Sequence, residues 1–135
     1  MKELNIDAKV ENIEKVTEFV DSELQKLDCP MKAQYQIDIA IDELFSNISN
    51  YAYDPLVGPA TVRIEVVSNP LAVVITFIDN GTPFNPLDVK DPDITESAEK
   101  RNAGGLGIYI VKKSMDAITY EYKDGKNILM IKKNM

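Results

Sequence analysis

The sequence predicts an α+β domain in which helices pack on one face of a mostly antiparallel mixed sheet, giving a two-layer sandwich. Three observations support this prediction. Two early segments carry apolar residues at helical spacing, and four later segments rich in Val, Ile, Tyr and Phe come in two pairs with short links. The length of 135 residues suits one hydrophobic core, so we expect a single domain over residues 1–135.

The expected order begins with a strand and two helices. Residues 2–8, KELNIDA, alternate polar and apolar side chains, which indicates a strand with one covered face. Residues 12–27 are apolar at helical spacing, and we expect a helix that ends before Pro30. The next helix is expected from 31 to about 51, with an apolar stripe of Ile37, Ile41, Leu44 and Ile48.

The second half is expected to hold two hairpins, an irregular stretch and a third helix. Residues 61–68 and 71–78 are rich in β-branched side chains, and the short link Asn69-Pro70 favours a hairpin between them. Residues 79–103 show little apolar periodicity, which is typical of a functional lid or a disordered segment. A helix within 104–115 and a closing hairpin of 117–122 with 127–132 complete the order.

Composition excludes several classes of function. The formal net charge of −7 argues against a nucleic acid partner, because a phosphate backbone needs a basic face. No apolar run approaches the roughly 18 residues of a membrane span. The single cysteine, Cys29, forms no internal disulfide and favours a cytoplasmic location. The absence of histidine excludes a Ser-His-Asp triad, a His-ligated metal and autophosphorylation on histidine.

The second helix carries polar residues where further leucines would be expected. Glu43 and Asn47 are four residues apart and Asn50 follows after three more, so a regular helix would place them on one stripe. An Asn amide oxygen is a good ligand for Mg²⁺, and a carboxylate can orient a hydroxyl for attack on a phosphate. Taken alone, a solvent-facing helix surface explains the stripe more simply.

Two glycine-containing segments could also hold a ligand. Asp79 ends an apolar strand, where it could accept a hydrogen bond from a ligand amino group, and Gly81 would let a flat ring approach the backbone. Asp-Asn-Gly is also a common turn. Gly104, Gly105 and Gly107 lead into a helix, whose N-terminal N–H groups can bind phosphate. The alternative is a flexible loop that ends at a helix cap. Their spacing fits neither a Rossmann fingerprint nor a Walker A loop.

In combination, these segments resemble the GHKL, or Bergerat-fold, ATPases. ELFSN at 43–47 matches the N box, DNG at 79–81 the first glycine box and GGLG at 104–107 the second. The closing hairpin resembles the last box, with Asn127 in place of the more usual Thr. DNGTPFNP and GGLGIYIVKKSMDAITYEY are most similar to the small stand-alone anti-sigma-factor serine kinases, and the likeness covers roughly Asn5 to Lys132.

The resemblance implies ATP and Mg²⁺ as cofactors. Asp79 would bind the adenine amino group, Gly81 would make room for the ring, and Asn47 would coordinate Mg²⁺. Asn50 would either assist Asn47 or lie at the rim of the site. The phosphates would lie against Gly104, Gly105, Leu106 and Gly107.

The resemblance also implies a catalytic pair. Glu43 would act as the base that activates a partner's serine hydroxyl, and Arg101 would neutralise the γ-phosphate. Arg101 could equally be a surface charge on the lid, and the roles of Thr95, Ser97 and Lys100 stay open.

The implied function is a regulatory serine kinase that sequesters a partner and phosphorylates an antagonist protein. The resemblance allows a sigma factor as the sequestered partner, and a homodimer, since similar proteins often dimerise. Three alternatives stay open: a nucleotide-binding module without turnover, a detached histidine-kinase catalytic domain with a separate histidine-bearing partner, and an α+β domain without a ligand.

Overall fold

The computed structural model describes residues 1–88 and 103–135. Its helices are α1 (Ile13–Gln25), α2 (Met31–Asn47) and α3 (Ala103–Ser114), with short turns η1 (Val10–Asn12), η2 (Ile48–Ala52) and η3 (Pro86–Asp88). Its strands are β1 (Lys2–Asp7), β2 (Pro59–Val67), β3 (Ala72–Asp79), β4 (Ala117–Lys123) and β5 (Lys126–Asn134). The expected order of elements is therefore confirmed.

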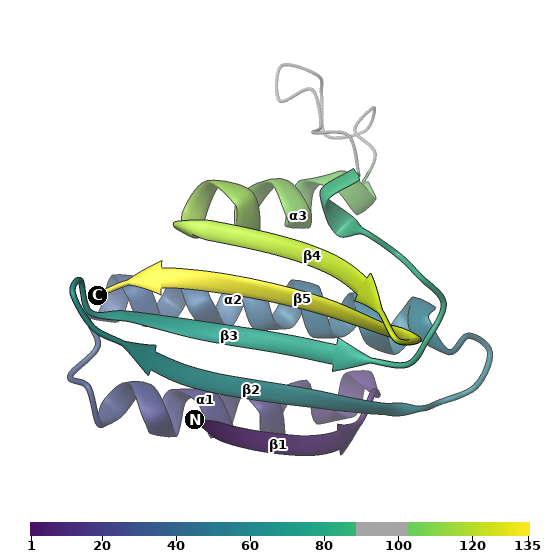
Figure 1. Cartoon of the computed structure of the whole chain (residues 1–135), viewed down its shortest axis with the longest axis horizontal. Coiled ribbons are helices and arrows are strands. Elements are labelled where there is room, and N and C mark those ends of the chain that lie inside the picture. Colours follow the sequence, from purple (N-terminus) through teal and green to yellow (C-terminus); the bar gives the residue numbers. More distant parts are fainter. Residues whose placement is uncertain (89–102) are drawn as a thin grey trace.

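The five strands form one sheet in the order β1-β2-β3-β5-β4. All four neighbouring pairs are antiparallel, so the described part of the chain contains no parallel pair, where a mixed sheet was predicted. Figure 1 shows the sheet from its open side, with α1 and α2 behind it. The structure confirms the α+β fold class with helices on one face. None of the described helices is long and apolar enough to cross a membrane.

The closing hairpin follows directly from its turn sequence. Asp124 and Gly125 link β4 to β5 and have φ angles of 53° and 77°. Two consecutive residues with positive φ match the right-handed twist of the flanking strands, and Asp-Gly adopts this turn readily. The turn pairs Lys123 with Lys126 and sets the register of the whole hairpin.

The core lies between the helices and the covered face of the sheet. The buried residues of α1 recur at helical spacing, and those of α2 follow the stripe read from the sequence. Burying one such aliphatic side chain stabilises the fold by about 1.5–3 kcal/mol. The largest fully buried side chains of the two helices and the sheet are Val16, Val20, Leu24, Ile37, Ile41, Leu44, Phe45, Val62, Ile75, Phe77 and Ile131.

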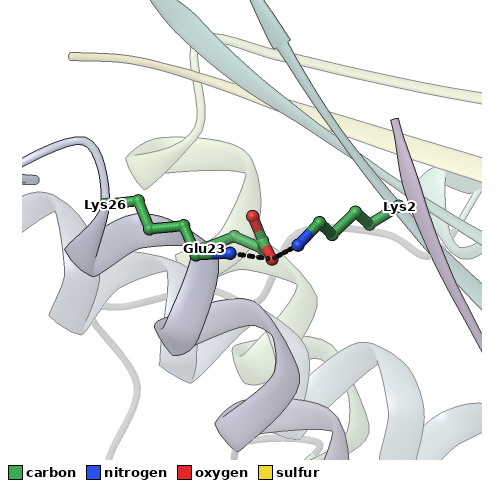
Figure 2. Close-up of polar contacts among 3 residues, drawn as sticks. All are labelled: Lys2, Glu23 and Lys26. Atoms are coloured by element: carbon green, nitrogen blue, oxygen red, sulfur yellow. Dashed lines mark hydrogen bonds and ion pairs between the residues drawn. The ribbon is translucent and has the colours of Figure 1, made fainter.

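A small ion-pair cluster links β1 to α1 at the surface. Figure 2 shows Glu23 between two lysines, with Oε1 of Glu23 3.0 Å from Nζ of Lys2 and 3.1 Å from Nζ of Lys26. The hydrogen bonds from these lysines lower the pKa of Glu23. Both lysines are exposed, so solvent screens the pairs and they add little to stability.

A pair of carboxyl groups lies between α1 and α2. Oδ1 of Asp21 and Oδ1 of Asp38 are both buried, and among the described residues neither oxygen has a hydrogen-bond partner as long as both groups are ionised. Burial raises the pKa of Asp38 to about 7, and the hydrogen bond and charge of Asp21 add to the shift. We infer that Asp38 is largely protonated below neutral pH, where its carboxyl O–H can donate to Asp21.

Asp38 should make the stability of the fold depend on pH. The pKa of Asp38 is about 7 in the folded state, above its ordinary value of 3.8. The protonated carboxyl group therefore contributes its full share to the free energy of unfolding below pH 3.8, and this share is lost as pH rises through about 7. We expect Asp38→Asn to remove this loss and to raise the free energy of unfolding at pH 8 by about 1–2 kcal/mol, a figure reduced for solvent screening. Urea denaturation at pH 5 and pH 8 measures both effects.

The exposed Glu18 on α1 supplies the matched control for this experiment. Glu18→Gln removes a carboxylate without touching the pair, so it should leave the pH dependence as in the wild type. An Asp38→Asn protein that still loses stability between pH 5 and pH 8 to the wild-type extent would contradict the assignment.

Candidate functional site

A pocket lies where the C-terminal end of α2 meets the C-terminal end of β3 and the N-terminal part of β5. It holds about 430 Å³ of space, including its open mouth. The apolar lining is Leu44, Ile48, Phe77, Phe84, Pro86 and Leu129. The polar lining is Asn47, Asp79, Thr82, Tyr120 and Asn127, and the lining is completed by Tyr51 and Ala52. Apolar walls with a few polar groups are typical of small-molecule sites.

Asp79 is the buried polar centre of this pocket. It is the last residue of β3 and is only 5% exposed. Its Oδ1 accepts hydrogen bonds from the backbone N–H of Gly81 and from Nδ2 of Asn127, both at 2.9 Å. These donors occupy one carboxylate oxygen, so Oδ2 is the oxygen with which Asp79 can receive a donor from a ligand.

Asn127 joins three parts of the pocket wall. Its Nδ2 donates to Asp79 and to the carbonyl of Thr82 at 3.0 Å, while its Oδ1 accepts from the backbone N–H of Phe84 at 3.2 Å and the hydroxyl of Tyr120 at 2.5 Å. Sequence reasoning singled out Asn127 only as a departure from a family motif, and it missed Tyr120. The pairing of β3 with β5 places Asp79 opposite Asn127, and this strand register is the signal that could have linked Asn127 to Asp79.

The turn η2 supports the loop that follows Asp79. The backbone N–H of Thr82 donates to the carbonyl of Ala52 at 2.8 Å, and that of Asn80 donates to the hydroxyl of Tyr53 at 2.8 Å. A Cβ atom on Gly81 would collide with the carbonyl oxygen of Ala52. The close backbone contact therefore requires glycine at this position, whatever a ligand requires.

Glu43 and Asn47 lie together on α2, as their spacing predicts. Nδ2 of Asn47 is 3.4 Å from Oε1 of Glu43 and donates to it. Burial raises the pKa of Glu43, the Asn47 hydrogen bond opposes the rise, and the charge of Asp42 adds to it. Because the amide nitrogen of Asn47 is engaged with Glu43, its oxygen is the atom available to a cation or a ligand.

The three glycines of the GGLG segment lie inside α3, although a glycine loop before a helix was predicted. α3 begins at Ala103, so Gly104 and Gly105 belong to its first turn. Glycine disfavours helix, but the burial of Ile108 and Val111 against the core stabilises the helix through tertiary packing. The backbone N–H groups of a first helical turn remain free to meet an anion.

Gly107 brings α3 close to Glu43. A Cβ atom at this position would collide with the carboxylate of Glu43. The same glycine therefore lets the helix that carries the GGLG segment approach the helix that carries Glu43 and Asn47. Two residues 64 positions apart in the sequence are thus in direct contact.

Asn50 does not line the pocket that Asn47 lines. It belongs to η2, which has π-helical geometry, and its exposed side chain donates to Oγ of Ser46 at 3.3 Å. The wider π turn changes the angular spacing of side chains, so the regular α-helical spacing on which the stripe was predicted ends at Asn47. Arg101, Lys100, Thr95 and Ser97 lie outside the described residues.

The residues present could hold a metal ion only together with further ligand atoms from a bound small molecule. Within residues 1–88 and 103–135, no group of three or more His, Cys, Asp or Glu side chains could hold a metal ion. The oxygen of Asn47 is a suitable hard donor for Mg²⁺, which usually keeps waters and phosphate oxygens among its ligands. The donor set therefore fits a metal that arrives with a phosphate.

Comparison with known proteins identifies the family of this chain. Residues 6–133 match the family model described as a histidine kinase-like ATPase domain. The serine-protein kinase RsbW of Bacillus mycoides is 28% identical over 134 residues, which cover 96% of this chain and 82% of that protein. RsbW of Bacillus thuringiensis is 32% identical over 98 residues, or 70% of this chain and 60% of that protein.

Two further similarities extend beyond RsbW. The serine/threonine-protein kinase BtrW of Bordetella bronchiseptica is 25% identical over 100 residues, covering 74% of this chain and 70% of that protein. The structure of the Acinetobacter baumannii histidine kinase AdeS superposes on the whole of this chain and 69% of its own, with a TM-score of 0.56 and 19% identity, which shows a shared fold. The GHKL resemblance is thereby confirmed, and the chain belongs to the histidine kinase-like ATPase domain family.

Proposed function

We propose that this protein is an ATP-dependent regulatory serine kinase, with residues 1–135 acting as one ATPase-type domain. The observation that carries the proposal is the pocket itself, in which the buried carboxylate of Asp79 lies among apolar walls and Asn47 lies at its edge beside Glu43. The relatives RsbW and BtrW, named as serine-protein and serine/threonine-protein kinases, support the same assignment.

The base of the nucleotide would occupy the apolar part of the pocket. Phe77, Leu129 and Ile48 offer surfaces on which a flat ring can pack. Oδ2 of Asp79 would accept a hydrogen bond from the 6-amino group of adenine. A carboxylate repels a carbonyl oxygen at that ring position, so this contact would favour adenine over guanine.

The phosphates would lie between α2 and the first turn of α3. The backbone N–H groups of Gly104 and Gly105 lie in the first turn, at the positive end of α3, where anions are stabilised. Leu106 and Gly107 follow in the helix and would line the same side of the phosphates. The oxygen of Asn47 would hold Mg²⁺ together with the phosphate oxygens. When bound, Mg²⁺ supplies neutralisation of the phosphate charge.

Glu43 would act as the general base. Its half-buried carboxylate would take the proton of the acceptor serine as the serine oxygen bonds to the γ-phosphorus and the bond to the β,γ-bridging oxygen breaks, releasing ADP. The Asn47 hydrogen bond orients the carboxylate. Arg101 remains the candidate for neutralising the γ-phosphate, on the strength of the family resemblance.

The acceptor would be a serine-bearing antagonist protein, and the same surface would sequester a partner such as a sigma factor. The names of the relatives support a protein substrate. The net charge of −7 also suits a protein partner better than a nucleic acid. A homodimer is part of the same proposal.

Phosphoryl transfer to an antagonist-type protein tests the proposed function. We expect incubation with Mg²⁺ and γ-labelled ATP to give acid-stable phosphoserine on the antagonist. Acid-labile phosphate on the acceptor would instead identify a histidine-kinase catalytic domain. ATP binding without any transfer would identify a nucleotide-binding regulatory module.

A further inference from the structure

Every donor of the Asn127 side-chain amide is engaged within the protein. Asn127 is 6% exposed. Its Nδ2 lies 2.9 Å from Oδ1 of Asp79, 3.0 Å from the carbonyl oxygen of Thr82 and 3.4 Å from that of Gly81. An amide nitrogen carries two hydrogens, so three acceptors saturate it. Asn127 therefore has no donor left for a ligand and can influence one only through the groups that it holds.

The acceptor end of the same amide determines its orientation. Oδ1 of Asn127 accepts from the hydroxyl of Tyr120 at 2.5 Å and from the backbone N–H of Phe84 at 3.2 Å. If the amide were reversed, its oxygen would face the carboxylate of Asp79 and its N–H groups would face two donors. Burial raises the pKa of the Tyr120 hydroxyl, so it remains a donor at neutral pH.

Asp79 consequently has one fixed and one free carboxylate oxygen. Oδ1 receives the N–H of Gly81 and Nδ2 of Asn127. With both donors in place, rotation of the carboxylate would break two hydrogen bonds in a buried site, which is costly. Oδ2 is therefore presented in a single direction.

We propose that Asn127, oriented by Tyr120, is a positioning residue that makes the pocket selective for a base with an exocyclic amino group. This inference rests on the proposed function, because it concerns how Asp79 receives adenine. Asn127 holds Oδ1 of Asp79, and Oδ2 can then accept only from a donor on the bound base. Without Asn127 only the N–H of Gly81 holds Oδ1, so the carboxylate rotates more easily and the pocket loses most of its preference for the amino group.

The test compares ATP with purine riboside triphosphate, which lacks only the 6-amino group. Binding is measured by calorimetry without an acceptor protein. The wild type should bind ATP about 10- to 100-fold more tightly, as expected for one hydrogen bond to a carboxylate. Asn127→Ala should lose most of this ratio, because ATP binding weakens while binding of the analogue hardly changes. Tyr120→Phe, which keeps the ring and removes only the hydroxyl, should give an intermediate ratio.

Asn134→Ala is the matched control, since Asn134 is an exposed asparagine at the other end of β5. It should keep the wild-type ratio. A purely structural role for Asn127 would weaken both nucleotides equally, and that result would overturn the inference while leaving the proposed function intact. If Asn127→Ala fails to fold, an unchanged ratio in Tyr120→Phe would overturn it in the same way. A wild type that binds neither triphosphate would overturn both.

Discussion

Glu43→Gln is expected to slow phosphoryl transfer to the acceptor serine by about 10²- to 10⁴-fold, the usual contribution of a general base. The amide keeps the size of the carboxylate and can still accept the Asn47 hydrogen bond, but it cannot take a proton. ATP affinity should stay nearly unchanged, because Glu43 is not among the residues that line the pocket. Single-turnover transfer at saturating ATP, combined with calorimetry, separates the two quantities.

The pH dependence of the same reaction provides a second measurement. Burial raises the pKa of Glu43 above its ordinary value of 4.5, and the base must be deprotonated to act. The wild-type rate should therefore rise with pH through this raised pKa and then level off, whereas the residual rate of Glu43→Gln should lack that rise. Glu65→Gln, an exposed change on β2, is the matched control and should behave as the wild type. Equal transfer rates for Glu43→Gln and wild type would rule out Glu43 as the base.

Asn47→Ala is expected to weaken binding of Mg-ATP by about 10- to 100-fold, as for the loss of a group that holds a metal. Binding of ATP in the presence of EDTA should change little, because Asp79 and the apolar walls are untouched. At nucleotide concentrations near 100 times the wild-type dissociation constant, the ligand stabilises the wild type by about 2.7 kcal/mol, and the variant should lose most of that stabilisation. Thermal melting with and without Mg²⁺ measures the difference.

Gln25→Ala removes an amide from the exposed end of α1 and is the control for this second experiment. It should show the full stabilisation by Mg-ATP. If Asn47→Ala weakens ATP equally with Mg²⁺ and with EDTA, the role of Asn47 is to shape the pocket and the metal assignment fails. Removal of Asn47 also removes a hydrogen bond that lowers the pKa of Glu43, so any transfer activity that remains should require a higher pH.

Local sequence was sufficient for most of the secondary structure. The stripes of α1 and α2, the alternating strands and the Asp124-Gly125 turn each depend on residues a few positions apart. Such patterns reflect helix and strand geometry directly. The contact between Glu43 and Asn47 is equally local, because helical residues four apart are neighbours.

Two local predictions differed from the structure because long-range contacts prevailed. The segment after Asn47 has a helical sequence pattern, yet it forms the π turn η2, whose Ala52 carbonyl binds the backbone of Thr82. The GGLG segment has poor helix propensity, yet it lies in α3, where Gly107 contacts Glu43. In both cases tertiary packing outweighs the intrinsic helix propensity of the residues. Relative to alanine, that propensity costs less than about 1 kcal/mol for most residues and about 1 kcal/mol for glycine.

The amino-acid sequence by itself determined the fold class, the order of elements and the motifs that mark an ATPase of this family. Only the tertiary structure showed that Asp79 and Asn127, 48 residues apart, face each other across β3 and β5 and share a hydrogen bond. Only the tertiary structure showed that the hydroxyl of Tyr120 donates to Oδ1 of Asn127. The physical reason is that apolar periodicity shows which face of a helix or strand is buried. Which residues face each other on neighbouring strands depends instead on strand register, which is set by the packing of the whole core.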